Sequence, residues 1–137
     1  MLQLRRRQWL EMVGHSFDHL PEEACGLLVG VPGGPVSGFR PTTNADHSAR
    51  TYSIDGRELL AVELALEAEG TGQEIVGVMH SHTHTDAYPS PTDVERAALL
   101  GDWHFLIVSL RHAEAQARCY RITEGNVTEE PIDLLGG

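Results

Sequence analysis

The segment from Glu74 to His82 constrains the fold most strongly, because an apolar run ends there in two histidines two positions apart. The run from Ile75 to Met79 has the composition of a buried β-strand. Alternate side chains of an extended strand point to the same face, so His80 and His82 are expected to aim their imidazoles at one point. The sequence therefore predicts a strand that presents two nitrogen ligands at its carboxyl end.

A predicted helix start follows a short stretch of turn residues. Ser90 has the residue type of an N-cap and Pro91 that of a first helical position, so Asp93 places a carboxylate in the first turn. Two histidines and one aspartate leave a fourth tetrahedral position open, as a catalytic zinc ion requires. These residues predict a zinc site formed by His80, His82 and Asp93.

His84 leaves a second ligand set open. If the strand continued beyond His82, His84 would share its face, and three histidines can hold zinc without a carboxylate. Asp86 is a further carboxylate in the same segment. The other histidines are scattered and are interpreted as surface or capping residues: His15, His19, His47, His104 and His112.

The spacing of these residues resembles that of the JAMM (MPN+) zinc metalloproteases. Their signature is an upstream Glu, then His-Ser/Thr-His, seven residues, Ser, two residues and Asp. Here the upstream residue is Glu23, in a segment similar to the family's Glu-x-Cys-Gly-Leu-Leu-x-Gly strand. Thr83 replaces a Pro that often follows the second His, which removes no ligand. Further family positions hold Asn44, Tyr52 and the apolar residues 105–109, so the resemblance covers most of the chain.

The resemblance implies catalytic roles for two residues. Glu23 would take a proton from water and return it to the leaving amine, and Ser90 would donate a hydrogen bond to the oxyanion of the scissile carbonyl. By position alone, an acid at a strand start can simply be exposed, which fits Glu22 better than Glu23. The choice of Glu23 over Glu22 depends on the family's spacing to the following Cys-Gly pair. Residue type alone also allows Ser90 to be only an N-cap. Ser81 is expected to point away from the histidines.

Composition excludes several classes of function. A net charge of −10 argues against a nucleic-acid partner. No apolar run reaches membrane-spanning length, and Arg5–Arg7 precedes no apolar signal segment, so neither a membrane association nor a signal peptide is expected. Cys25 and Cys119 form no disulfide framework, which favours a cytoplasmic location, and Cys25 is expected to be a small buried side chain. At 137 residues, the chain is expected to be one domain, 1–137.

Strands and helices mix without regular βαβ alternation, which predicts an α+β fold with a largely antiparallel or mixed sheet flanked by helices. The resemblance implies the same curved sheet, in the JAMM/MPN, cytidine-deaminase-like fold. Leu10, Val13, Phe17 and Leu20 predict the apolar face of the first helix. A disordered tail is expected for 134–137. The expected helices are 6–20, 56–69 and 91–100, and the expected strands are 1–4, 24–31, 36–44, 51–54, 74–82, 103–110, 115–122 and 127–132.

The resemblance implies a zinc-dependent peptidase or isopeptidase of the compact prokaryotic branch. Members similar to it remove a C-terminal cysteine, or another adduct, from ubiquitin-like sulfur-carrier proteins that end in Gly-Gly, a step of cysteine biosynthesis. We therefore expect hydrolysis after the Gly-Gly of such a carrier. Two alternatives stay open: a deconjugase of lysine-linked ubiquitin-like modifiers, and a non-catalytic interaction domain of the same fold. The sequence also leaves a homodimer open.

Overall fold

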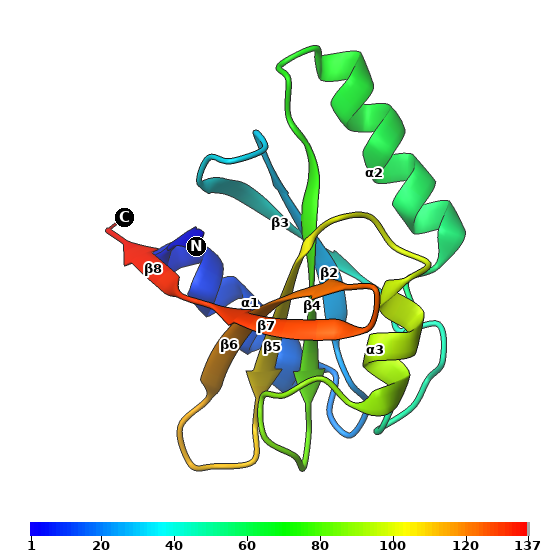
Figure 1. Cartoon of the computed structure of the whole chain (residues 1–137), viewed down its shortest axis with the longest axis vertical. Helices are drawn as coiled ribbons and strands as arrows, with labels where there is room; N and C mark the ends of the chain where they lie inside the picture. The colour runs from blue at the N-terminus through cyan, green and yellow to red at the C-terminus, as the bar shows by residue number, and fades with distance from the viewer. Residues whose placement is uncertain (137) are drawn as a thin grey trace.

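The structure is a computed structural model that describes residues 1–136. Three helices and eight strands follow one another along these residues (Figure 1). They are β1 (Leu2–Arg5), α1 (Arg6–Asp18), β2 (Cys25–Gly30), β3 (Val36–Thr42), α2 (Gly56–Glu69), β4 (Glu74–His82), α3 (Pro91–Ala97), β5 (His104–Ser109), β6 (Gln116–Thr123), β7 (Asn126–Glu130) and β8 (Ile132–Leu135). None of the helices in this part of the chain is both long and apolar enough to cross a bilayer.

The main sheet has six strands in the order β3-β2-β4-β5-β6-β7. Only β4 and β5 run parallel, with α3 in the connection between them, and the other neighbours are antiparallel. The sheet is therefore mixed, and the predicted α+β fold is confirmed. The strand that carries the two histidines lies inside the sheet, between β2 and β5, where hydrogen bonds hold its backbone on both sides.

Helices cover both faces of this sheet (Figure 1). Met12 of α1 packs with Met79 and Leu106 on one face, while Ala97 of α3 and Leu66 of α2 belong to clusters on the other. Successive side chains of a strand alternate between faces. Because Met79 faces α1, the next residue, His80, points to the opposite face, which α2 and α3 cover. His82 lies two residues further along β4 and points to the same face as His80.

The predicted apolar face of α1 is wrong. Leu10 and Phe17 are 61% and 52% exposed, whereas Gln8 and Ser16 are buried. Burial of these polar side chains is tolerated because their hydrogen-bonding groups are satisfied: Gln8 donates to the Val36 carbonyl and Ser16 to that of Met12. The spacing of apolar residues alone therefore predicted the wrong side of α1 to be buried.

Other departures from the predicted elements are local. Residues 51–54 form no strand; Ile54 makes only one bridge, with Asn44, and 43–55 is a loop. The expected tail disorder is wrong for Leu134 and Leu135, which lie in β8 and pair in parallel with β1, whereas Gly137 is outside the described residues. The third helix ends at Ala97, three residues earlier than predicted.

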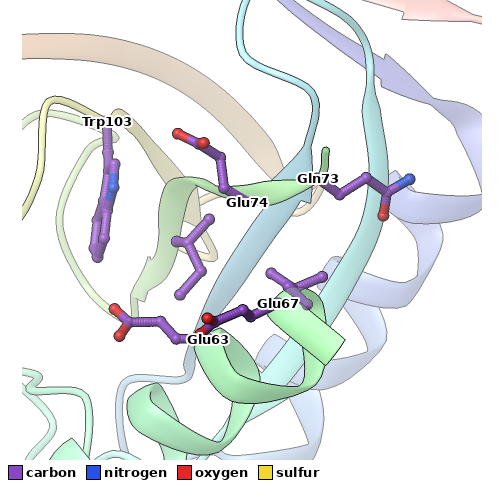
Figure 2. A pocket seen from close by; sticks show the side chains of 7 residues that line it. Glu63, Glu67, Gln73, Glu74 and Trp103 are labelled. Carbon is purple, nitrogen blue, oxygen red and sulfur yellow. The ribbon is translucent and has the colours of Figure 1, made fainter. Parts of the chain in front are cut away.

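A surface cavity of about 330 Å³ lies at the start of β4, between that strand and α2 (Figure 2). Glu63 and Glu67 of α2, Glu74 of β4 and Trp103 surround it. The histidines occupy the opposite end of the same strand. This acidic cavity is therefore separate from the candidate site.

Candidate metal centre and its cleft

Strand β4 delivers two imidazoles to one buried point. His80 and His82 point to the same face, and their Nε2 atoms lie 3.0 Å apart. Both rings are almost completely buried. The sheet register fixes them, because His80 is opposite Cys25 on one side and Ile107 on the other. The strand alternation expected from the sequence is confirmed.

Asp93 comes to the same point from the first turn of α3. Its Oδ2 atom lies 3.1 Å from the Nε2 atom of each histidine and accepts a hydrogen bond from the Ser90 backbone at 2.9 Å. In return, the Ser90 hydroxyl accepts from the Asp93 backbone N–H, which completes a capping box. The cap that begins the helix therefore also orients the carboxylate.

Burial and hydrogen bonds together set the ionisation of these groups. It lowers the pKa of His80, against the opposing effect of the Asp93 hydrogen bond. It also disfavours ionised Asp93, but hydrogen bonds from His80 and His82 outweigh burial and hold the pKa of this carboxyl well below its usual range. A metal ion binds neutral imidazole and ionised carboxylate. The lowered pKa values of His80 and Asp93 therefore suit metal binding.

The three donor atoms fit a metal ion such as zinc. Tetrahedral zinc holds nitrogen and oxygen ligands at about 2.0–2.2 Å, which places ligand atoms roughly 3.3 Å apart. The donor atoms of His80, His82 and Asp93 are separated by 3.0–3.1 Å. The Nδ1 atom of His82 lies 2.8 Å from the Asp86 carbonyl, where an N–H donates, so its Nε2 lone pair is left for a metal. His80 is held by stacking on Tyr52, with ring centroids 4.1 Å apart.

Glu23 lies beside this donor set, two residues before the start of β2. Its side chain is 3% exposed, and its Oε1 atom has no hydrogen-bond partner among residues 1–136. Burial raises the pKa of Glu23 to about 8. Glu22 is only half-buried and lies 3.6 Å from His47. Of the two acids, only Glu23 lines the cleft with His82.

This cleft has a volume of about 650 Å³, and His82 is the member of the donor set that lines it. Ser90 joins Glu23 and His82 in its wall, so three of the five predicted site residues line the cleft. Asp93 contacts His82 and the Ser90 backbone from outside this lining. The remaining lining residues are Ala49, Arg50, Thr83, His84 and Thr85.

The three-histidine alternative is not formed. Strand β4 ends at His82, and His84 turns to the surface with its Nδ1 atom 2.7 Å from the Thr83 hydroxyl. Asp86 is exposed and pairs with Arg111. Ser81 faces away from the histidines, as expected, and its hydroxyl accepts from the Ala24 backbone.

Cys25 is buried, as expected, and burial raises the pKa of its thiol to about 11. A thiol in this state is not a nucleophile at neutral pH. The interpretation of His104 as a surface or capping residue is wrong, because its side chain is largely buried and contacts Glu130 and Arg121. Strand pairing brings these residues together from β5, β6 and β7, and no local spacing could indicate it.

A mixed sheet covered by helices on both faces, with a buried His-His-Asp set where a strand ends and a helix begins, is the arrangement of a JAB (MPN) domain. The family model for prokaryotic homologs of the JAB domain matches residues 5–123. The chain belongs to this family.

Three relatives illustrate the similarity. A CysO-cysteine peptidase of Mycobacterium tuberculosis is 41% identical over 126 residues, which cover 90% of this chain and 84% of the relative. A desampylase of Haloferax volcanii is 36% identical over 91 residues, 65% of this chain and 63% of the relative. The solution structure of a Desulfitobacterium hafniense protein superimposes with a TM-score of 0.87 at 34% identity, covering 100% of this chain and 94% of that one. With the donor set in place, this chain is a JAMM-type hydrolase.

Proposed function

We propose that this chain is a zinc-dependent peptidase that hydrolyses the bond after the C-terminal Gly-Gly of a ubiquitin-like sulfur-carrier protein and releases cysteine or another amine. One observation carries the proposal: the buried donors of His80, His82 and Asp93 converge beside Glu23, whose Oε1 atom has no hydrogen-bond partner among the described residues. The names of the two relatives support a ubiquitin-like protein as the substrate. Two cysteines without a disulfide favour the cytoplasm as its location.

In this proposal His80, His82 and Asp93 hold zinc, which when bound supplies a Lewis acid that polarises the scissile carbonyl and activates water. Glu23 takes a proton from the attacking water and passes it to the leaving nitrogen as the amide C–N bond breaks. Water supplies the hydroxyl of the new glycine carboxyl group. A raised pKa of about 8 would keep Glu23 protonated at neutral pH, and a cation on the adjacent donors favours its ionised form.

The geometry of Ser90 is compatible with two roles. Its oxygen accepts a hydrogen bond from the Asp93 backbone, and a serine hydroxyl that accepts one hydrogen bond still has its own proton to donate. We propose that this proton is donated to the oxyanion of the scissile carbonyl. The N-cap and the oxyanion donor are then the same group.

The experiment is mass spectrometry of a carrier–Gly-Gly-Cys protein before and after incubation with the zinc-loaded enzyme. Loss of one cysteine is expected, with the loss abolished by a chelator and restored by zinc. Glu23→Gln keeps the side-chain shape but cannot accept the proton, so it should bind zinc and lose at least about a hundredfold in turnover. The matched control Glu22→Gln should cleave like the wild type. Undiminished turnover of Glu23→Gln would remove Glu23 from the mechanism.

The substrate arms of this experiment separate the alternatives. Replacing the last Gly of the carrier by Val should slow cleavage strongly, because a β-branched side chain crowds the approach to the metal. The desampylase relative supports a second candidate, a deconjugase, which would cut a Gly-Gly–lysine isopeptide and leave the cysteine adduct intact. Cleavage of neither substrate by the fully zinc-loaded protein would contradict the Gly-Gly proposal.

A further inference from the structure

Within residues 1–136, Arg50 is the only arginine that lines the cleft with Glu23 and His82, and the sequence contains no lysine. Among the described residues, no carboxylate lies within ion-pair distance of its side chain, although four other arginines form such pairs. The residue is exposed, so its guanidinium is open to a ligand in the cleft. Other arginines also lack such a partner, and Arg50 differs from them because it lines the cleft.

The backbone that carries Arg50 is held rigidly beside the site. The Ser48 hydroxyl accepts hydrogen bonds from the backbone N–H groups of Arg50 and Thr51. The Ala49 carbonyl, directly before Arg50, accepts from the Thr83 hydroxyl at 3.2 Å, and Thr83 follows the second histidine. Loop 43–55 is therefore attached to the end of β4 at the position of Arg50.

The same loop is attached to Glu23. The Glu23 N–H donates to the Ser48 carbonyl at 2.8 Å, and its carbonyl accepts from the Asn44 side chain at 3.0 Å. Asn44 is fully buried and also donates to the Ser48 and Thr51 carbonyls. The backbone of Arg50 is thus held close to that of Glu23, the residue that we propose protonates the leaving amine.

The position of Arg50 near Glu23 favours a leaving group that has a carboxylate close to its nitrogen. A residue whose nitrogen receives a proton from Glu23 must lie beside Glu23. If that residue is a C-terminal amino acid, its α-carboxylate is one carbon from the leaving nitrogen. A flexible arginine can then form a charge-assisted, two-pronged pair with this carboxylate. A lysine side chain linked through its ε-nitrogen has no carboxylate at that place.

We infer that Arg50 binds the free α-carboxylate of the residue released after Gly-Gly, so that the preferred substrate class is a carrier with one C-terminal amino acid rather than a lysine-linked conjugate. The inference rests on the proposed function, and it adds a specificity-determining residue to it. It assigns Arg50 no part in proton transfer.

The test compares a carrier–Gly-Gly-Cys acid with its C-terminal amide, which differ only in the carboxylate charge. The wild type should cleave the acid about tenfold to a hundredfold more efficiently in kcat/KM. Arg50→Gln should remove most of this preference by raising KM for the acid, with little change for the amide. Arg50→Lys should restore part of the preference for the acid, because lysine keeps the positive charge but lacks the planar guanidinium that binds a carboxylate through two hydrogen bonds.

Arg40→Gln is the matched control: Arg40 is also exposed but lies on β3 outside the cleft, so its variant should keep the wild-type preference. Equal wild-type cleavage of acid and amide, or an Arg50→Gln variant that retains the preference or loses both activities alike, would overturn the role of Arg50 while the proposed function stands. If the zinc-loaded wild type cleaved neither substrate, the proposed function itself would fail and this inference with it.

Discussion

At the scale of single residues, the site is a group of polar side chains placed where burial is costly. An isolated buried charge costs several kcal/mol or more unless it is paired. His80, His82 and Asp93 share this cost through contacts with one another. Glu23 does not, because its Oε1 atom has no partner in the part of the chain described. A buried carboxyl oxygen without a hydrogen-bond partner destabilises the folded state, but that oxygen is free to accept a proton.

The first prediction concerns the metal ligands. The purified protein should hold about one zinc ion per chain, and His80→Ala, His82→Ala and Asp93→Ala should each lower zinc affinity by more than the roughly 10- to 100-fold typical of supporting residues. His84→Ala is the control and should keep full zinc, because His84 lies outside the donor set. Elemental analysis measures the content. Full zinc in Asp93→Ala together with loss in His84→Ala would establish the three-histidine site instead.

At the scale of elements, the site depends on how closely β2 approaches β3. Gly26 lies one residue after Cys25, which pairs with both His80 and Thr42. A Cβ atom at Gly26 would lie within 2.8 Å of the Arg40 carbonyl oxygen and within 2.6 Å of two ring atoms of Phe39. Glycine is required here by space, and the strand pairing that positions the histidines depends on it.

The second prediction follows from this contact. Gly26→Ala should lower the free energy of unfolding by about 1–3 kcal/mol, the usual cost of overpacking a close contact, as measured by urea denaturation. Gly38→Ala on the neighbouring β3 is the control, because nothing lies within 4 Å of its added Cβ, and it should unfold close to the wild type. Equal stability of Gly26→Ala and the wild type would show that β2 and β3 separate without cost.

At the scale of the whole molecule, Glu130 ties the far side of the sheet to the chain start. Its carboxylate contacts His104 of β5, Cys119 and Arg121 of β6, and the Met1 amino group. Burial opposes its ionisation, but hydrogen bonds from His104 and Cys119 outweigh burial and lower the pKa of Glu130 to about 2. Side chains from two strands and the Met1 amino group thus contact one carboxylate, which lies outside the cleft lined by Glu23 and His82.

The third prediction concerns acid. Because the pKa of Glu130 is lower in the folded protein than its ordinary value of 4.5, ionised Glu130 stabilises the fold fully above pH 4.5 and progressively less as the pH falls toward 2. Glu130→Gln should therefore cost about 1–3 kcal/mol at pH 7, and its difference from the wild type should shrink between pH 4.5 and 2 in urea titrations.

Glu129→Gln provides the control for acid stability. Glu129 forms an exposed pair with Arg118, so its loss should change stability by less than about 1 kcal/mol at any of these pH values. A gap between wild type and Glu130→Gln that stays constant down to pH 2 would show that the Glu130 charge does not stabilise the fold.

Local spacing was sufficient for the parts of the site that lie within one element. His80 and His82 share a face because a strand repeats every two residues, and Asp93 lies in a first turn because Ser90 and Pro91 begin a helix. Glu23 came from the resemblance to a family, since its distance from the histidines along the chain carries no geometric information. The α+β class, in contrast, followed from the order of strands and helices along the sequence.

Tertiary structure decided what depends on contacts between distant segments. Leu10 and Phe17 are exposed because Gln8 and Ser16 find backbone partners, and Leu134 and Leu135 are ordered because β1 offers them an edge. Loop 43–55 is placed by Asn44, whose hydrogen bonds reach Glu23. The sequence by itself determined the local placement of the His80–His82 pair and of Asp93, through the two-residue repeat of a strand and the cap of a helix. Only the folded chain decided which polar groups are paired, because pairing depends on neighbours that sequence distance does not reveal.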